Sequence, residues 1–239
     1  MRAKDYDRAY PEDLVGQDFF KEDMLEKIGV TSDRLVYKFG SYKLPDVQEC
    51  DFEAIDWDEP YNFGFDSFSR PVGGGGLVTK VSITESDKED RGLRGSSPFT
   101  GTGFDAGHIL GRELFLGSDF NTSKKNKENI YRQTTWSNEG NHPKKQNCYE
   151  ASWGYNQSFF ENIIANKIKD ENNPIEVKYR ADLIYHDDEL IPRGIHIRSL
   201  CNKPDEYEEL NFNYFIPNVE IDGIIDYNST EKLRLVSDE

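Results

Sequence analysis

The stretch NQSFFENIIANKIKDENNPIEVKYRADLIY, residues 156–185, decides the fold class of this chain. Its first half carries apolar residues at helical spacing, and Pro174 closes that helix. Its second half alternates strictly, so that every second residue from Ile175 to Tyr185 lies on one face of a strand. The apolar helix face consists of Phe160, Ile163, Ile164 and Ile168. A helix and a strand that each have one apolar face indicate that helices pack on a sheet.

The segments that follow extend this pattern. GIHIRSL at 194–200 and LNFNYFI at 210–216 have the composition of two more strands. A helix followed by three strands favours an antiparallel sheet with helices packed against it. The sequence therefore predicts an α+β fold with a central antiparallel sheet.

The first third of the chain is less regular. DFFKEDMLEKIGV at 18–30 predicts a short amphipathic helix that stops at Gly29, and RLVYKFGSYKL at 34–44 predicts a strand and a turn. The four glycines at 73–76 predict a flexible turn, and LVTKVSIT at 77–84 alternates as a strand does.

Length and composition limit the class of protein. The 239 residues suffice for one core, and the three widely spaced cysteines form neither a disulfide framework nor a zinc motif. No apolar run approaches the roughly 18 residues that span a bilayer, and the first residues do not form a secretory signal. We expect no membrane partner. Three alternatives stay open: a cytoplasmic protein in the producing cell, export by a signal-independent route, and a domain of a longer chain.

The net charge of −16 is distributed unevenly. Residues 1–59 carry 8 basic and 16 acidic side chains, and residues 170–239 carry 7 and 17. Residues 105–169 carry 9 basic and 7 acidic side chains and alone have a positive balance. An acidic chain is a poor nucleic-acid binder overall, because phosphate contacts supply most non-specific affinity. We divide the chain into an acidic N-terminal appendage of unknown role, 1–59, and a main domain, 60–239.

The candidate chemistry lies in that middle region, around the segment FDAGHILG at 104–111. A histidine beside a glycine is usually structural, and single Asn residues usually cap helices or form turns. Here a set of polar residues follows in a fixed order, which makes the pattern specific. The set is Asp105, Gly107 and His108, then Asn129 and Gln133, then Asn138 and finally Glu150. His142, His186 and His196 lack such a pattern, and we expect them to be ordinary loop or strand residues.

This order resembles the DNA/RNA non-specific endonuclease family, whose site is a ββα-metal (His-Me) finger. Within it, the chain is similar to competence-associated and streptococcal extracellular DNases and to bacterial nuclease toxin domains. The family has Asp-Arg-Gly-His on the first finger strand, Asn-Ile and Gln on the second, and a metal-binding Asn on the helix. The likeness covers about residues 66–230, and DSFSRP at 66–71 resembles a turn of the family. This chain departs from the family at Ala106, where arginine is usual, and at Glu139, where glutamine is common.

The resemblance implies a role for each residue. His108 would be the general base, since a neutral imidazole accepts a proton near pH 7, with a backbone carbonyl orienting its second nitrogen. Asn138 would bind Mg²⁺, with Mn²⁺ as a substitute, and Glu150 would hold metal-bound waters. Asn129 and Gln133 would position the finger or a substrate phosphate. Arginines would stabilise the developing negative charge, and further residues would support the site. The charge-stabilising candidates are Arg70, Arg91 and Arg94, with Arg91 placed among the catalytic residues, and the supporting residues are Asp105, Gly107 and Arg132.

The implied activity is metal-dependent, sequence-non-specific hydrolysis of DNA, and of RNA as well, leaving 5′-phosphate ends. The implied context is a bacterial toxin with a cognate immunity protein, or a secreted nuclease. The acidic surface motivates a catalytically weak nuclease-fold protein that binds a protein partner or mimics nucleic acid. A further hypothesis is that residues 1–59 occupy the basic groove until they are removed. The lysines beside the motif fit a phosphate track and a solvated face equally well: Lys124, Lys125, Lys127, Lys144 and Lys145.

Overall fold

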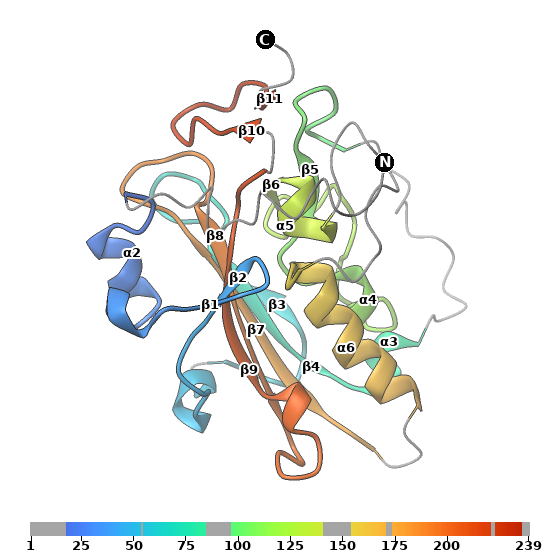
Figure 1. Ribbon diagram of the computed structural model, residues 1–239. Helices are drawn as coiled ribbons and strands as arrows, with labels where there is room; N and C mark the ends of the chain where they lie inside the picture. The colour runs from blue at the N-terminus through green and yellow to red at the C-terminus, as the bar shows by residue number, and fades with distance from the viewer. Residues whose placement is uncertain are drawn as a thin grey trace, which may run out of the picture.

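The structure, a computed structural model, contains a seven-stranded antiparallel sheet in the order β1-β2-β9-β8-β7-β4-β3 (Figure 1). The α+β prediction with a central antiparallel sheet is confirmed. The structure describes residues 18–53, 55–84, 97–140, 154–170, 174–220 and 223–235. The strands are β1 (Val36–Lys38), β2 (Ser41–Lys43), β3 (Tyr61–Asn62), β4 (Gly73–Val78), β7 (Val177–Ile184), β8 (Gly194–Cys201) and β9 (Phe212–Pro217).

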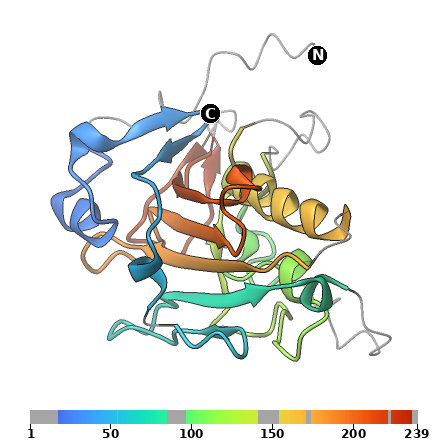
Figure 2. The ribbon, with the colours of Figure 1, turned by 90° about the horizontal axis from the view of Figure 1, so that it is seen from below.

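Different helices cover the two faces of this sheet. Alternate residues of β7 pack beneath α6, in which Ile164 and Ile168 are almost fully buried. Burial of an isoleucine contributes about 1.5–3 kcal/mol, so this apolar face stabilises the main core. The opposite face carries Phe215, against which α2 packs. Figures 1 and 2 show α2 and α6 on opposite sides of the strands. The helices are α2 (Glu22–Lys27), α3 (Lys80–Ile83), α4 (Arg112–Phe115), α5 (Thr135–Glu139) and α6 (Gln157–Asp170).

A separate two-stranded hairpin carries the sequence motif. β5 (Asp105–His108) pairs with β6 (Ile130–Gln133) in antiparallel register, and α5 follows directly. The side chain of Thr134 caps the start of α5 by accepting a hydrogen bond from the Ser137 amide. Gly140 ends the helix with φ 71°, a left-handed conformation that glycine adopts without strain. The order strand, strand, helix places the motif residues on three adjoining elements.

The glycine run at 73–76 forms a strand, so the predicted flexible turn is wrong. β4 pairs with β7 on one side and with β3 on the other. A Cβ on Gly76 would lie 2.7 Å from the ring of Phe115, closer than any ordinary carbon contact. Gly76 therefore lets Phe115 of α4 pack directly on the strand backbone, which periodicity alone does not reveal. The predicted strand at 77–84 continues only to Val78, because the chain turns into α3 at Lys80.

The described part of the acidic segment 1–59 contributes two strands to the same sheet. Its strand β2 pairs with β9, and β1 forms the outer edge. A role of its own for the segment stays a prediction, but 36–43 are a structural part of the domain. Within the described ranges no helix is long and apolar enough to cross a membrane. The remaining short elements are η2 (Ser32–Arg34), η3 (Glu49–Phe52), η4 (Glu208–Leu210), β10 (Gly223–Ile224) and β11 (Arg234–Leu235).

Candidate active site

A cleft of about 540 Å³ opens beside the hairpin and α5. Asp105 and His108 line it from β5, Asn138 lines it from α5, and Glu161 lines it from α6. Three residues of the predicted set therefore share one cavity. The fourth, Glu161, was not expected from the sequence.

His108 is held in one orientation by the backbone. Its Nε2 lies 3.0 Å from the carbonyl oxygen of Thr122, so Nε2 carries the proton and donates it. Burial lowers the pKa of His108 to about 4, and the charges of Lys124 and Arg112 lower it further, against the hydrogen bond to Thr122. The imidazole is thus neutral at pH 7, and Nδ1 is left to accept a proton. The carbonyl acceptor expected in this region is Thr122.

The amide nitrogen of Asn138 forms a hydrogen bond with another side chain of the site. Nδ2 donates to Oδ2 of Asp105 at 3.1 Å, which leaves the carbonyl oxygen of Asn138 as the atom that can bind a cation. Burial raises the pKa of Asp105, the hydrogen bond from Asn138 opposes that rise, and the charge of Glu139 adds to it. The pair therefore fixes the end of the hairpin to the last turn of α5.

Asn129 and Gln133 are buried and hold the hairpin from inside. The side chain of Asn129 accepts from the Leu110 amide at 2.9 Å and donates to the Leu110 carbonyl at 3.1 Å, which fixes the chain just after His108. Gln133 lies across Gly107, where a Cβ would be 2.1 Å from its Oε1. Because both side chains are fully buried, they position the hairpin, and neither reaches a substrate phosphate.

Two residues of α6 complete the site, and the sequence reasoning missed both. Gln157 donates to the carbonyl oxygen of His108 at 2.6 Å and to Oε1 of Glu161 at 2.9 Å. It also accepts from the hydroxyl of Tyr131 at 3.1 Å and from Gln133 at 3.0 Å. Gln157 thus joins the backbone of His108 to a buried carboxyl group.

Glu161 is 9% exposed, and burial raises its pKa to about 7. Gly111 is required beside it, since a Cβ there would lie 2.1 Å from Oε2 of Glu161. The available signal was helical spacing: Glu161 precedes Ile164 and Ile168 by three and seven residues, so it shares their buried face. A carboxylate on the apolar face of a helix is rarely there without a partner.

The charges around the cleft are mainly negative. Its acidic residues are Asp105, Glu113, Glu139 and Glu161, and its basic residues are Arg112 and Lys124. Lys125 and Lys127 are exposed outside it, and Lys144 and Lys145 lie outside the described residues. An anionic substrate would therefore approach this cleft more readily with a cation bound.

Arg70, one of the predicted charge-stabilising arginines, does not line this cleft. Arg70 is 8% exposed, and its Nε donates to Asp66 at 2.7 Å. Its NH1 donates to the carbonyl oxygens of Asp187 and Glu189 at 2.9 and 2.6 Å. With its donors used, Arg70 ties the 66–70 turn to the β7–β8 connection, so we remove it from the substrate-binding set. Arg91, Arg94 and Glu150 lie outside the described residues.

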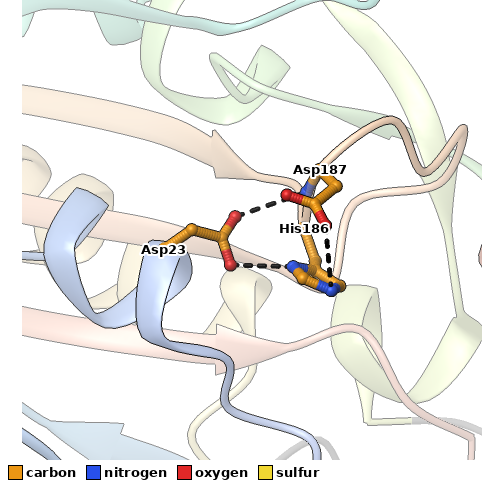
Figure 3. A group of neighbouring side chains, drawn as sticks. All are labelled: Asp23, His186 and Asp187. Atoms are coloured by element: carbon orange, nitrogen blue, oxygen red, sulfur yellow. Dashed lines mark hydrogen bonds and ion pairs between the residues drawn. The ribbon is translucent and has the colours of Figure 1, made fainter.

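A second group of ionisable residues lies away from the cleft, between α2 and the end of β7 (Figure 3). Asp23, His186 and Asp187 each offer a ligand atom within 4.8 Å of the others, as a metal site requires. However, Nζ of Lys27 already lies 3.0 Å from Oδ2 of Asp23. Lys27 also donates to the carbonyl oxygen of Tyr185 at 2.6 Å. We assign this group to the attachment of α2.

Comparison with solved structures shows which proteins have this architecture. No family model matches the chain. The structure is similar to NucA from Streptococcus agalactiae with no metal bound, with a TM-score of 0.66 at 19% identity, covering 92% of this chain and 97% of that one. The chain has the NucA fold. NucA with a magnesium ion bound gives a TM-score of 0.62 at 19% identity, covering 84% and 89%.

The Sda1 nuclease with a bound zinc ion is also similar, with a TM-score of 0.53 at 17% identity, covering 75% of this chain and 82% of Sda1. The resemblance to non-specific endonucleases is therefore confirmed at the level of the fold. Identities below one fifth show the fold alone, so the chemistry of this chain is argued from its own cleft.

Proposed function

We propose that this chain is a metal-dependent, sequence-non-specific endonuclease that hydrolyses the phosphodiester bonds of DNA and RNA. The observation that carries the proposal is the neutral imidazole of His108, oriented by Thr122, in one cleft with Asn138 and Glu161. The shared fold supports it, because Sda1 is a nuclease whose structure contains a zinc ion.

The two ring nitrogens of His108 have different roles in the proposed reaction. Nε2 stays bonded to Thr122, while Nδ1 takes a proton from water as the water oxygen attacks phosphorus. The bond from phosphorus to the 3′ oxygen breaks, and the leaving 3′ oxygen takes a proton from a solvent water, which leaves a 5′-phosphate and a 3′-hydroxyl. General-base catalysis by a positioned histidine contributes about 10²- to 10⁴-fold to such a rate.

The cleft suits a hard divalent cation. The carbonyl oxygen of Asn138 and the carboxylates of Glu161 and Asp105 are oxygen donors, the type that Mg²⁺ and Mn²⁺ prefer. Asn138 would hold the ion directly, and Glu161 would hold its waters, the role that the resemblance to the endonuclease family implies for Glu150. A bound ion supplies positive charge for the leaving 3′ oxygen. The excess of carboxylates around the cleft also favours a cation there.

Cleavage of supercoiled plasmid DNA and of single-stranded RNA tests the proposal, with Mg²⁺, Mn²⁺ or a chelator present. We expect wild type to cut both substrates with either ion and to lose activity in chelator. His108→Ala should reduce the rate by at least about 100-fold, because the base is lost. His186→Ala is the matched control and should retain nearly full activity, since His186 lies in the α2 attachment.

The alternative function has a clear signature in the same experiment. If folded wild type cuts neither substrate with any divalent ion tested, the nuclease proposal is wrong. A nuclease-fold protein that binds a protein partner or mimics nucleic acid would then be favoured. The toxin or secreted context and a cognate immunity protein stay predictions of the resemblance, and co-purification of an inhibitor from the producing cell would test them.

A further inference from the structure

Arg132 lies across the hairpin from Ala106. The two residues are register partners in β5 and β6, and His108 is paired with Ile130, the next residue on the same face. Diagonal neighbours on one face of a strand pair are about 7–8 Å apart, so Arg132 starts from the same face of the strand pair as His108. Its guanidinium carbon lies 4.5 Å from the ring centre of Phe99, which itself lines the cleft.

The guanidinium of Arg132 is partly buried and lacks an acidic partner among the described residues. Its Nε is buried and has no acceptor there, and burial lowers its pKa. The other arginines that are not exposed in the described ranges each pair with a carboxylate: Arg70 with Asp66, Arg180 and Arg198 with Asp182, and Arg193 with Glu189. In a chain with 45 acidic and 29 basic side chains, carboxylate partners are plentiful. The guanidinium of Arg132 has no carboxylate partner among the described residues, and its neighbours Phe99 and Ala106 line the cleft, so it is a site for an anion that comes from outside.

Two neighbours keep this site open. Ala106 is small and lines the cleft, so it leaves the space in front of Arg132 free of a competing side chain. Phe99 supports the guanidinium plane, which leaves the edge of the fork for hydrogen bonds. The fork of an arginine matches two oxygens of one phosphate.

We propose that Arg132, on β6 opposite Ala106, binds a backbone phosphate of the nucleic acid. This phosphate is the neighbour of the scissile phosphate. The proposal rests on the nuclease function proposed above. It adds a substrate contact that holds the strand while His108 acts on the neighbouring phosphate, so loss of Arg132 weakens binding more than it slows chemistry.

DNA binding in a His108→Ala background tests this without cleavage. The dissociation constant of a fluorescent DNA duplex is measured in Mg²⁺ at several NaCl concentrations, with Arg132 and with Arg132→Met, which keeps the apolar packing on Phe99. We expect Arg132→Met to weaken binding about tenfold, the order of one charge-assisted contact. The slope of log affinity against log salt concentration is negative, and it should become less negative by about 0.9. Arg132→Lys should recover part of both.

A relocation variant separates phosphate binding from packing. The double variant Arg132→Ala/Ala106→Arg places an arginine on the paired residue of the neighbouring strand. This variant should recover much of the DNA affinity and of its salt dependence. Equal affinity and slope for Arg132 and Arg132→Met would overturn the assignment of Arg132 alone. Absence of DNA binding by the His108→Ala protein, together with absence of cleavage by wild type, would overturn the nuclease function and this contact together.

Discussion

Two histidines of this chain lie near carboxylates, and their surroundings differ. His108 bonds one ring nitrogen to a backbone carbonyl and keeps the other for a proton. His186 has a carboxylate at each nitrogen, Asp23 at 2.7 Å and Asp187 at 3.4 Å. Asp23, His186 and Asp187 have ligand atoms close enough to hold a metal, yet Lys27 already forms an ion pair with Asp23. A catalytic base is therefore recognised by a ring nitrogen that is free to accept a proton and by a cleft beside it, more than by the number of acidic neighbours.

The largest expected effect on cleavage comes from neutralising Glu161, which shares the cleft with His108, and the matched change is made at Asp187 beside His186. Glu161→Gln keeps the shape of the side chain but removes the negative charge, so we expect cleavage to fall about 100-fold, the scale of losing one charge-stabilising group. The Mg²⁺ concentration for half-maximal activity should also rise. Initial rates over a Mg²⁺ titration provide the measurement.

Asp187→Asn is the matched control for Glu161→Gln, because it neutralises an acid beside the other histidine. Its cleavage rate and Mg²⁺ dependence should equal those of wild type. A large loss in Asp187→Asn, or none in Glu161→Gln, would reverse the assignment of the two groups.

The support behind His108 gives an intermediate effect. Gln157→Leu removes the donor to the His108 carbonyl and leaves several buried polar groups unpaired. The free energy of unfolding should drop by about 2 kcal/mol, the usual cost of such a loss, and cleavage should slow. Asn162→Leu, an exposed change on the same helix, should shift stability by less than about 0.5 kcal/mol. Urea unfolding of both variants measures these free energies. Equal stability of Gln157→Leu and Asn162→Leu would show that the hydrogen bonds of Gln157 contribute little to folding.

The attachment of α2 gives the smallest effect. Burial would raise the pKa of Asp23, but hydrogen bonds from Lys27 and His186 outweigh it and lower this pKa to about 2. The stability that comes from this depressed pKa is present above the ordinary carboxyl pKa and disappears as the pH falls through about 2. Asp23→Asn should therefore cost less than about 1 kcal/mol at pH 7 and still less at pH 3, since the pair is partly exposed.

Urea unfolding of wild type and Asp23→Asn at both pH values measures the difference, and cleavage should not change. A stability difference between the two proteins that grows toward pH 3 would contradict a depressed pKa of Asp23.

Much of the fold could be predicted because its helices and strands each have one apolar face. The face from Ile175 to Tyr185 follows directly from alternation, and α6 follows from helical spacing. The glycine run could not be predicted as a strand, because its reason is the close approach of Phe115 from a distant segment.

Part of the candidate site could likewise be predicted from the sequence, and part could not. The order of His108 and Asn138 along the chain identified the hairpin and its helix. Thr122 acts through its backbone carbonyl, so its residue type carries no signal. Gln157 and Glu161 reach the site only because α6 packs beside the hairpin, a contact between segments far apart in sequence.

Chemical rescue by imidazole tests whether His108 is the general base. His108→Gly should lose at least about 100-fold in cleavage rate, and the cavity left by the ring should admit free imidazole as a replacement base. Added imidazole should restore cleavage in proportion to its concentration and to its unprotonated fraction, while His186→Gly should keep its activity and show no response. A folded His108→Gly protein that retains full activity, or that imidazole does not rescue, would contradict the assignment of His108 as the base.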